Sequence, residues 1–327
     1  MADLVTVFGG SGFVGSQIVR ALARAGYRIR VAVRNPGRGY RLPMLGDVGQ
    51  IEVFQANLRN ADSVDRALDR ARFCINAAAV LYESGRQTFE ALHVEGARTV
   101  ALTAAARNIE RLVQISAIGA DANSSSKYAR TKAAGEAVAR EAIAGAIVIR
   151  PSVVFGPADA FFNRFASMAL TSPVLPLIGG GATRFQPVFV GDVAEAVACS
   201  LSDPSAVGRT YELGGPAIYS FRELMEILLR DIRRERLLAP VPFPIARLLG
   251  LGGDLVAATG LIAPPITSDQ VEMLRSDNIV SPGAHTLADL GVAASALEPI
   301  LPTYLYRYRK GGQYAEVIQA AAALPPR

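Results

Sequence analysis

The chain contains very little cysteine. Only Cys74 and Cys199 occur among its 327 residues, and they stand far apart in the sequence. Neither lies near a CxxC pair or a Cys/His cluster, and no carboxylate-rich constellation is present, which argues against a disulfide scaffold and a structural zinc site. We therefore expect a protein without a bound metal in a reducing compartment.

Long uninterrupted apolar runs are also missing. The longest apolar stretch covers residues 237–262 and contains Arg247, Asp254 and three prolines. We expect this stretch to be packed or interfacial and not to span a membrane. A glycine-rich motif begins at Gly9, directly after a short apolar run, so we expect no signal peptide or transit sequence.

Neither sign of charge is in large excess. The sequence has 34 Lys and Arg against 29 Asp and Glu, a net charge of +5 and an isoelectric point of about 9.4. This balance suits an anionic partner such as phosphates, acidic lipid or an acidic protein face, without choosing among them. The arginines are not interleaved with aromatic residues as on a nucleic-acid platform, so we expect no nucleic-acid partner. With half of its residues hydrophobic, the chain is not a disordered protein.

Strand and helix patterns alternate through the first half of the chain. Short β-branched runs predict strands at residues 4–8, 28–33, 51–54, 73–75, 112–115 and 146–149. Helical patterns separate them, and this alternation predicts an α/β fold with a doubly wound parallel sheet of the Rossmann type. Beyond Pro151 the rhythm loosens. We expect a first domain over residues 1–160, to which segments from about 186–213 return, and a smaller C-terminal lobe over 161–327.

A glycine-rich loop joins the first strand to the first helix. Its sequence is Gly9-Gly10-Ser11-Gly12-Phe13-Val14-Gly15. Gly9 allows the tight turn, Gly12 lets the backbone approach a pyrophosphate, and Gly15 allows the helix to pack closely on the strand. The helix N-terminus then presents free N–H groups to the anion. The first domain is therefore predicted to bind a dinucleotide.

The end of the second strand indicates which dinucleotide is bound. Arg34 stands there, Arg38 and Arg41 follow closely, and no acid occurs before Asp47. A cation suits a 2′-phosphate, whereas an acid would suit the 2′-hydroxyl of NADH. Ser11 can add a hydroxyl to the same phosphate. We therefore predict NADPH, with a solvated arginine on a basic surface as the alternative reading of Arg34.

Tyr128 and Lys132 lie four residues apart on one face of a predicted helix. In this arrangement a lysine ammonium can hold ribose hydroxyls and lower the tyrosine pKa, which makes the tyrosine a general acid. Ser126 is interpreted as a helix N-cap and not as a nucleophile. A single histidine on a helix is more often packed than catalytic, and we interpret His93 in that way.

These motifs resemble those of the extended short-chain dehydrogenases/reductases. The resemblance implies a nicotinamide-nucleotide site in which Tyr128 and Lys132 hold the nicotinamide ribose. It departs from the family pattern at Ser116, which stands two residues early for the usual hydroxyl, and at His93, which replaces an asparagine. The nucleotide site is thus expected to be intact and the substrate-activating half incomplete. The resemblance rests on Gly9-x-x-Gly12-x-x-Gly15, Asn76-Ala77-Ala78-Ala79, Tyr128-x-x-x-Lys132 and Arg150-Pro151-Ser152-Val153-Val154-Phe155-Gly156-Pro157.

The resemblance also implies roles for residues at the ends of other strands. Asn57 and Leu58 are expected to flank the adenine, and Ala77 and Ala78 to line the cofactor. The remaining predicted cofactor contacts are Phe13, Pro151 and Val153.

Longer segments resemble one branch, the NADPH-holding accessory subunits of respiratory complex I (NADH:quinone oxidoreductase). This resemblance implies tightly held NADPH and a structural role at the junction of the peripheral and membrane arms. The partners it implies are other complex I subunits, with the lipid surface as a further contact. With no targeting sequence, we expect a bacterial protein, peripheral on the cytoplasmic face of the inner membrane. The segments are residues 46–50, 124–136, 162–168, 269–272 and 287–291.

Two other classes of function stay open. An NADPH-dependent reductase or epimerase acting on an apolar carbonyl compound or a sugar derivative is supported by Tyr128 and Lys132. A redox-sensing regulator that binds NADP(H) without chemistry is the third class. Near the C-terminus, residues 304–310 combine tyrosines with cations, which suits either a lipid headgroup zone or an ordinary amphipathic helix.

Overall fold

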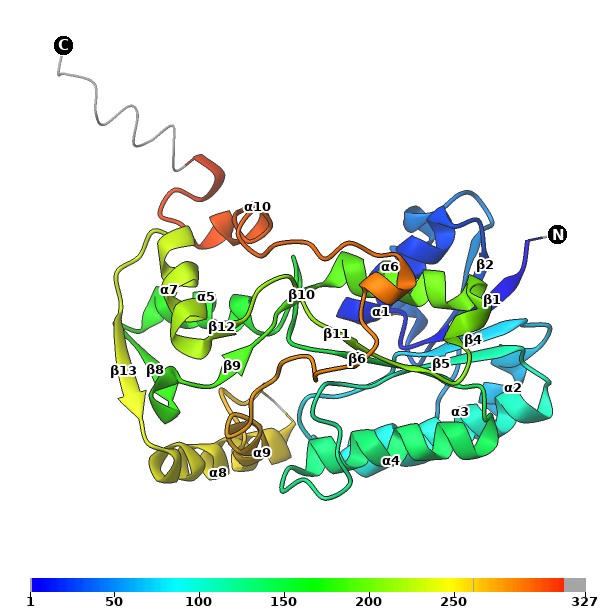
Figure 1. Ribbon diagram of the computed structural model, residues 1–327, viewed down its shortest axis with the longest axis horizontal. Helices are drawn as coiled ribbons and strands as arrows, with labels where there is room; N and C mark the ends of the chain where they lie inside the picture. The colour runs from blue at the N-terminus through cyan, green and yellow to red at the C-terminus, as the bar shows by residue number, and fades with distance from the viewer. Residues whose placement is uncertain (1, 261, 315–327) are drawn as a thin grey trace, which may run out of the picture.

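A seven-stranded parallel sheet forms the centre of the protein. The computed structural model describes residues 2–260 and 262–314, and its main sheet has the order β11-β6-β5-β4-β1-β2-β3 (Figure 1). The predicted α/β fold with a doubly wound parallel sheet is confirmed. The strands are β1 (Leu4–Phe8), β2 (Arg28–Val33), β3 (Ile51–Gln55), β4 (Phe73–Asn76), β5 (Arg111–Ile115), β6 (Ile147–Pro151) and β11 (Thr210–Leu213).

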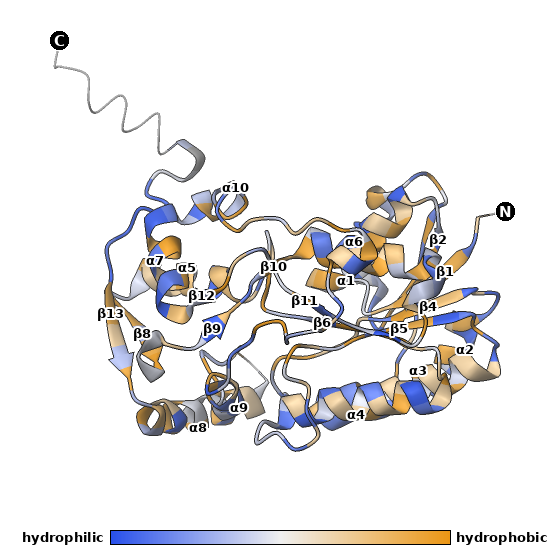
Figure 2. Ribbon diagram, viewed as in Figure 1, coloured by the Kyte–Doolittle hydropathy of each residue, from blue (hydrophilic) through white to orange (hydrophobic). Residues whose placement is uncertain are grey.

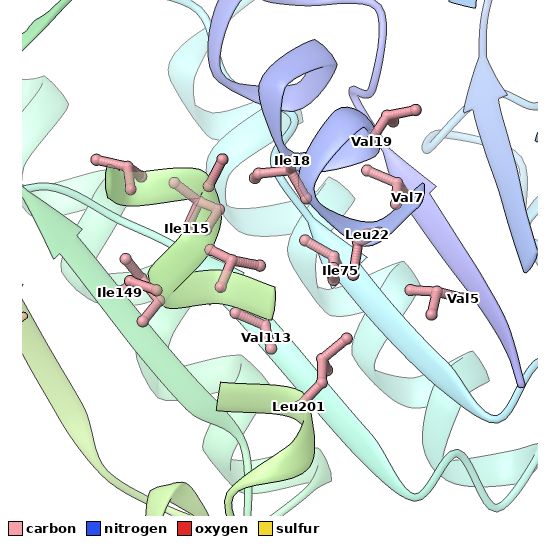
Figure 3. Packing of buried hydrophobic residues seen from close by; sticks show 14 of the residues in the cluster. Val5, Val7, Ile18, Val19, Leu22, Ile75, Val113, Ile115, Ile149 and Leu201 are labelled. Carbon is pink, nitrogen blue, oxygen red and sulfur yellow. The ribbon is translucent and has the colours of Figure 1, made fainter. Parts of the chain in front are cut away.

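Helices cover both faces of this sheet. On one face lie α1 (Phe13–Arg24) and α6 (Val190–Ser202); on the other lie α2 (Ala61–Leu68), α3 (Glu95–Ala106) and α4 (Lys127–Ala142). Figure 3 shows Val5 and Val7 of β1 packed against Ile18 and Leu22 of α1. All four side chains are fully buried, and their removal from water stabilises this layer.

The six strands expected in the first half are all present, with bounds within one or two residues of the prediction. The helical segment before α3 is irregular. A π-helical turn, Glu90–Val94, precedes α3 and contains His93. Such turns inside helices often occur near functional sites, where they change the direction of side chains.

The smaller lobe is built around aromatic side chains. Phe161, Phe165, Phe185 and Phe221 form a continuous cluster with ring centroids 5.4–6.3 Å apart. Its helices are α5 (Phe162–Thr171), α7 (Phe221–Asp231), α8 (Phe243–Thr259), α9 (Ser268–Met273) and α10 (Pro302–Leu305). Its short strands pair as β7 (Val154–Phe155) with β10 (Val188–Phe189), β8 (Val174–Ile178) with β13 (Leu237–Val241), and β9 (Arg184–Phe185) with β12 (Tyr219–Ser220).

Small residues bring α8 and α9 unusually close. A Cβ atom on Gly253 would lie 1.7 Å from the Ile266 carbonyl oxygen, and one on Gly250 would lie 2.7 Å from the Ser268 backbone. Because the inner side of α8 is made of such residues, its large aliphatic side chains point outward. Figure 2 shows much of α8 coloured as hydrophobic. In the described ranges, 2–260 and 262–314, no helix is both long and apolar enough to cross a membrane.

The segment after α10 differs from both sequence interpretations. The helix ends at Leu305 and 3₁₀ turns follow. Tyr304 is buried and its hydroxyl donates to Asp159 Oδ2 at 2.6 Å. For Tyr304, the headgroup-zone alternative is therefore wrong, because the hydroxyl has a partner inside the lobe. Residues 315–327 of the predicted second lobe lie outside the described residues.

Gly253→Ala should destabilise the smaller lobe by about 2–3 kcal/mol, because the added methyl group collides with backbone at the α8–α9 contact. The matched control is Gly252→Ala on the same helix, where a Cβ atom meets nothing within 4 Å. Since alanine is the better helix former, that change should be neutral or stabilising by up to about 1 kcal/mol. Chemical denaturation measures both values, and equal effects of the two changes would contradict this packing.

Candidate functional site

The predicted site residues gather at the carboxyl ends of the parallel strands. The neighbours of β1 are β2 on one side and β4 on the other. The helix α1, which follows β1, covers one face of the sheet, and α3, which follows β4, covers the opposite face. Open α/β sheets bind ligands at this switch point, outside the carboxyl ends of the strands. The loops after β1, β2, β3, β4, β5 and β6 all meet there.

The glycine loop has the backbone geometry expected for a phosphate site. Gly9 has a φ of +78°, and its carbonyl accepts a hydrogen bond from Gly12 N at 3.0 Å. A Cβ atom on Gly15 would lie 2.2 Å from the Gly9 carbonyl oxygen, so only glycine permits this contact between helix and loop. No side chain caps the N-terminus of α1. The uncapped N–H groups and the positive end of the helix dipole therefore fit the pyrophosphate of a dinucleotide.

Arg34 and Ser11 lie in two loops that begin side by side, at the ends of β2 and β1. In the β1–β2 register Phe8 pairs with Ala32, so the chain leaves both strands at the same level, toward Ser11 and Arg34. Both side chains are exposed. Arg34 makes no hydrogen bond or ion pair with the part of the chain that the structure describes. A guanidinium available at this edge suits a phosphate on the adenosine ribose.

The loops after β3 and β4 flank the same edge. Asn57 is half-buried and Leu58 is buried. Ala77 and Ala78 approach the glycine loop so closely that a Cβ atom on Gly9 would lie 2.7 Å from their shared peptide. This brings the predicted adenine and cofactor-lining positions to one side of the loop.

Phe13 and the loop after β6 lie on the other side of the glycine loop. The Phe13 ring lies 3.4 Å from the position of a Cβ atom on Gly156. Pro151 is buried at the end of β6, and its carbonyl accepts a hydrogen bond from Ile118 N at 3.0 Å. Val153 is half-buried. The structure thus brings together, around the glycine loop, the cofactor residues predicted in the loops and at the strand ends.

Tyr128 and Lys132 lie on the buried side of α4. Lys132 Nζ lies 6.0 Å from the centre of the Tyr128 ring and donates to the Ile115 carbonyl oxygen at 2.9 Å. Burial lowers the pKa of Lys132 to about 8, against an opposing effect of Glu136. A ligand hydroxyl would have to share or replace this bond to the β5 backbone.

The expected lowering of the Tyr128 pKa is wrong for the chain without a nucleotide. Burial, followed by the charge of Asp269, raises the pKa of Tyr128 to about 12. Tyr128 therefore stays protonated near neutral pH and can donate a hydrogen bond, but it is a poor base.

His93 is a packed residue, as the sequence interpretation proposed. Val80 N donates to His93 Nε2 at 3.2 Å, so we assign the ring proton to Nδ1, which lies 3.2 Å from Thr131 Oγ1. The ring stacks on Phe89 and meets Tyr128 edge-on. Burial, then the charge of Lys132, lowers the pKa of His93 to about 3. A neutral imidazole thus joins the loop after β4 to helix α4.

Ser116 does not reach the space beside Tyr128. It is buried at the end of β5, and its hydroxyl has no hydrogen-bond partner among the described residues. A cavity of about 320 Å³ lies next to Tyr128 and Lys132, and the loop after β5 contributes Ala117 and Ile118 to its wall. The hydroxyl groups in this wall come from Ser124, Ser125 and Ser126, just before α4.

The smaller lobe contributes two residues whose part in the site the sequence does not reveal. Asp269 accepts three hydrogen bonds from the start of α4. Asn278 accepts from Val153 N at 3.0 Å and donates to the Ile118 carbonyl oxygen at 3.2 Å. No local pattern could identify them, because both contact partners more than 120 residues away. In the part of the chain that the structure describes, no group of His, Cys, Asp and Glu could hold a metal ion.

Comparisons with known proteins identify the family. Residues 5–214 match the NAD dependent epimerase/dehydratase family. The chain belongs to this family.

Among its relatives, NADH dehydrogenase [ubiquinone] 1 alpha subcomplex subunit 9, mitochondrial, of Arabidopsis thaliana is 35% identical over 316 residues, which cover 94% of this chain and 79% of that one. A ceramide reductase of Caulobacter vibrioides is 33% identical over 58% of each chain. The crystal structure of a Citrobacter sp. triphenylmethane reductase complexed with NADP(H) has the same fold, with a TM-score of 0.71 and 17% identity over 92% of this chain and 99% of that one. The predicted relationship to reductase-like proteins and to a respiratory NADH dehydrogenase subunit is confirmed.

His93 should make the protein sensitive to acid. Its pKa is lower in the folded chain than in the unfolded one, so the unfolded state binds the proton first and stability falls as the pH drops below about 6.5. Between pH 6.5 and 5, the free energy of unfolding should fall by roughly 1–2 kcal/mol less in His93→Asn than in the wild type. The half-exposed His285 provides the control, His285→Asn. Urea unfolding at several pH values measures the slope, and an unchanged slope in His93→Asn would contradict the assignment.

Proposed function

We propose that the chain is an NADPH-binding accessory subunit of a bacterial respiratory NADH:quinone oxidoreductase and holds NADPH as a structural group. The observation that carries this proposal is the contrast within one site. The glycine loop and its surroundings suit a dinucleotide, whereas the loop after β5 has an apolar residue, Ile118, at the position where the family resemblance implies a hydroxyl. The relationship to the Arabidopsis subunit supports the assembly.

Each predicted residue has a role that suits its position. Gly9, Gly12 and Gly15 would hold the pyrophosphate, and Arg34 with Ser11 the 2′-phosphate. The remaining roles follow the strand ends: Asn57 and Leu58 at the adenine, Phe13, Ala77, Ala78, Pro151 and Val153 along the cofactor, and Tyr128 with Lys132 at the nicotinamide ribose. Bound NADPH supplies a hydride in the enzymes of this family.

The chain's own groups favour retention over turnover. With a pKa of about 12, Tyr128 releases its proton less readily than a tyrosine whose pKa is lowered, and Lys132 Nζ is bonded to the Ile115 carbonyl. A ligand that binds only the folded state stabilises it in proportion to the logarithm of its concentration over Kd. Tight NADPH would therefore contribute directly to the stability of the subunit.

The outer face of α8 suits the membrane arm of such an assembly. Leu248 and Leu255 are 70% and 74% exposed, and Ile245, Leu249 and Leu251 are also more than half exposed. The small residues on the inner side of the helix keep this aliphatic face outward. We place this face at the junction of the arms, on the cytoplasmic side of the bacterial inner membrane, against lipid or a neighbouring subunit.

The second candidate is an NADPH-dependent reductase that acts on an apolar carbonyl compound. A protonated Tyr128 beside a cavity of about 320 Å³ favours it, and the ceramide reductase supports it as a relative. Consumption of NADPH on addition of long-chain carbonyl compounds would favour this function over the structural one.

Arg34→Glu should weaken NADPH binding at least tenfold, since a charge-assisted hydrogen bond becomes a repulsion, at about 1.4 kcal/mol per factor of ten. Arg28→Glu makes the same charge change at the other end of β2 and should leave Kd unchanged. Fluorescence titration gives Kd, and co-purification with the respiratory complex gives incorporation. Full NADPH retention by Arg34→Glu would count against the site.

Leu248→Glu combined with Leu255→Glu should reduce association with the respiratory complex or membrane several-fold, because two charges would have to be buried in an apolar contact. Leu102→Glu with Leu170→Glu is the matched control, since these exposed leucines lie on α3 and α5. Fractionation of membranes followed by detection of the chain gives the bound share. If both pairs behave alike, α8 is not the contact.

A further inference from the structure

We propose that Asp269 of α9 is a positioning residue of the nucleotide site, which fixes the first turn of α4 and so links NADPH binding to the docking of α8 and α9. The proposal rests on the proposed NADPH binding and adds a residue from the smaller lobe to it. The linkage is reciprocal: whatever strengthens one contact should strengthen the other.

The Asp269 carboxylate occupies the N-terminus of the helix that bears Tyr128 and Lys132. Its Oδ1 accepts from Lys127 N at 2.6 Å, and its Oδ2 accepts from Tyr128 N at 3.1 Å and from Ser126 Oγ at 2.9 Å. Ser126 is the N-cap and accepts from Ala129 N at 3.2 Å. The first N–H groups of α4 are thus shared between its own cap and an acid from the other lobe.

This contact places a negative charge where the helix dipole favours one. A carboxylate at a helix N-terminus stabilises the first turn, and the effect falls off within that turn. Tyr128 is the second residue of α4, so its backbone lies within this range. Loss of the charge would free the turn that sets the position of the tyrosine, while the rest of α4 stays packed on α3.

Neighbouring contacts make the segment 269–278 a continuous link. Gln270 Nε2 donates to the carbonyl oxygen of Leu81 at 3.3 Å, and Leu81 lies in the loop after β4. At the other end of the segment, Asn278 holds Val153 N and the Ile118 carbonyl. Three strand-end loops around the nicotinamide side therefore meet one segment of the smaller lobe.

The same segment is joined tightly to α8. Ser268 lies against Gly250, and its backbone N donates to Asp254 Oδ1 at 3.3 Å. The Ser268 hydroxyl is also hydrogen-bonded to the Asp254 carboxylate. Because these contacts leave no gap between α8 and α9, a shift of α9 away from α4 must carry α8 and its aliphatic face along.

The test is Asp269→Asn in the full chain, compared with Asp289→Asn, which removes an acid that bonds Thr286 and does not contact α4. We expect NADPH to bind about tenfold more weakly to Asp269→Asn and unchanged to Asp289→Asn. Asp269→Glu, which keeps the charge, should recover part of the affinity. Equal NADPH affinity in Asp269→Asn and the wild type would overturn the proposal.

Amide hydrogen exchange distinguishes a positioning role of Asp269 from a purely structural one, because only the positioning role makes exchange in α8 and α9 depend on NADPH. NADPH should slow amide exchange in residues 243–273 of the wild type and should fail to do so in Asp269→Asn. If Asp269→Asn does not fold, the wild-type measurement decides alone, and exchange in α8 and α9 that ignores bound NADPH would overturn the link. A wild-type chain that binds no NADPH would instead contradict the proposed function.

Discussion

The approach of the first helix to the first loop is the constraint on which the site depends. Gly15 stands so close to the Gly9 carbonyl that any side chain would separate helix and strand. The same contact leaves the N-terminus of α1 without a side-chain cap. The first N–H groups of α1 therefore have no side-chain acceptor and are open to an anion. A pyrophosphate bound there would fill this role, as the proposed function requires.

The second half of the site follows from burial. Phe89, His93 and Tyr128 pack together between α4 and the π-helical turn, which keeps His93 neutral and Tyr128 protonated. Through Val80 and Thr131, His93 also connects the loop after β4 to α4. The proposed retention of the nucleotide would depend on this packed wall.

Much of the fold could be predicted from the sequence because its signals are local. Short β-branched strands, the glycine loop and the Tyr128–Lys132 spacing each depend on a few consecutive residues. The Tyr128 pKa could not be predicted, because it depends on burial and on Asp269, which is 141 residues away. The environment of Tyr304 could not be predicted for the same reason, since its partner Asp159 is 145 residues away in the sequence. The closeness of α8 and α9 depends on which glycines face each other, and composition does not reveal that.

The most direct test of the account is the nucleotide content of the respiratory particle that carries this chain. The particle would be extracted gently from membranes, and its nucleotides would be quantified by mass spectrometry before and after turnover with NADH and quinone. The account predicts NADPH in an amount equal to the chain, still reduced after turnover. A chain recovered outside any such particle without nucleotide, or with nucleotide oxidised and exchanged during turnover, would contradict it.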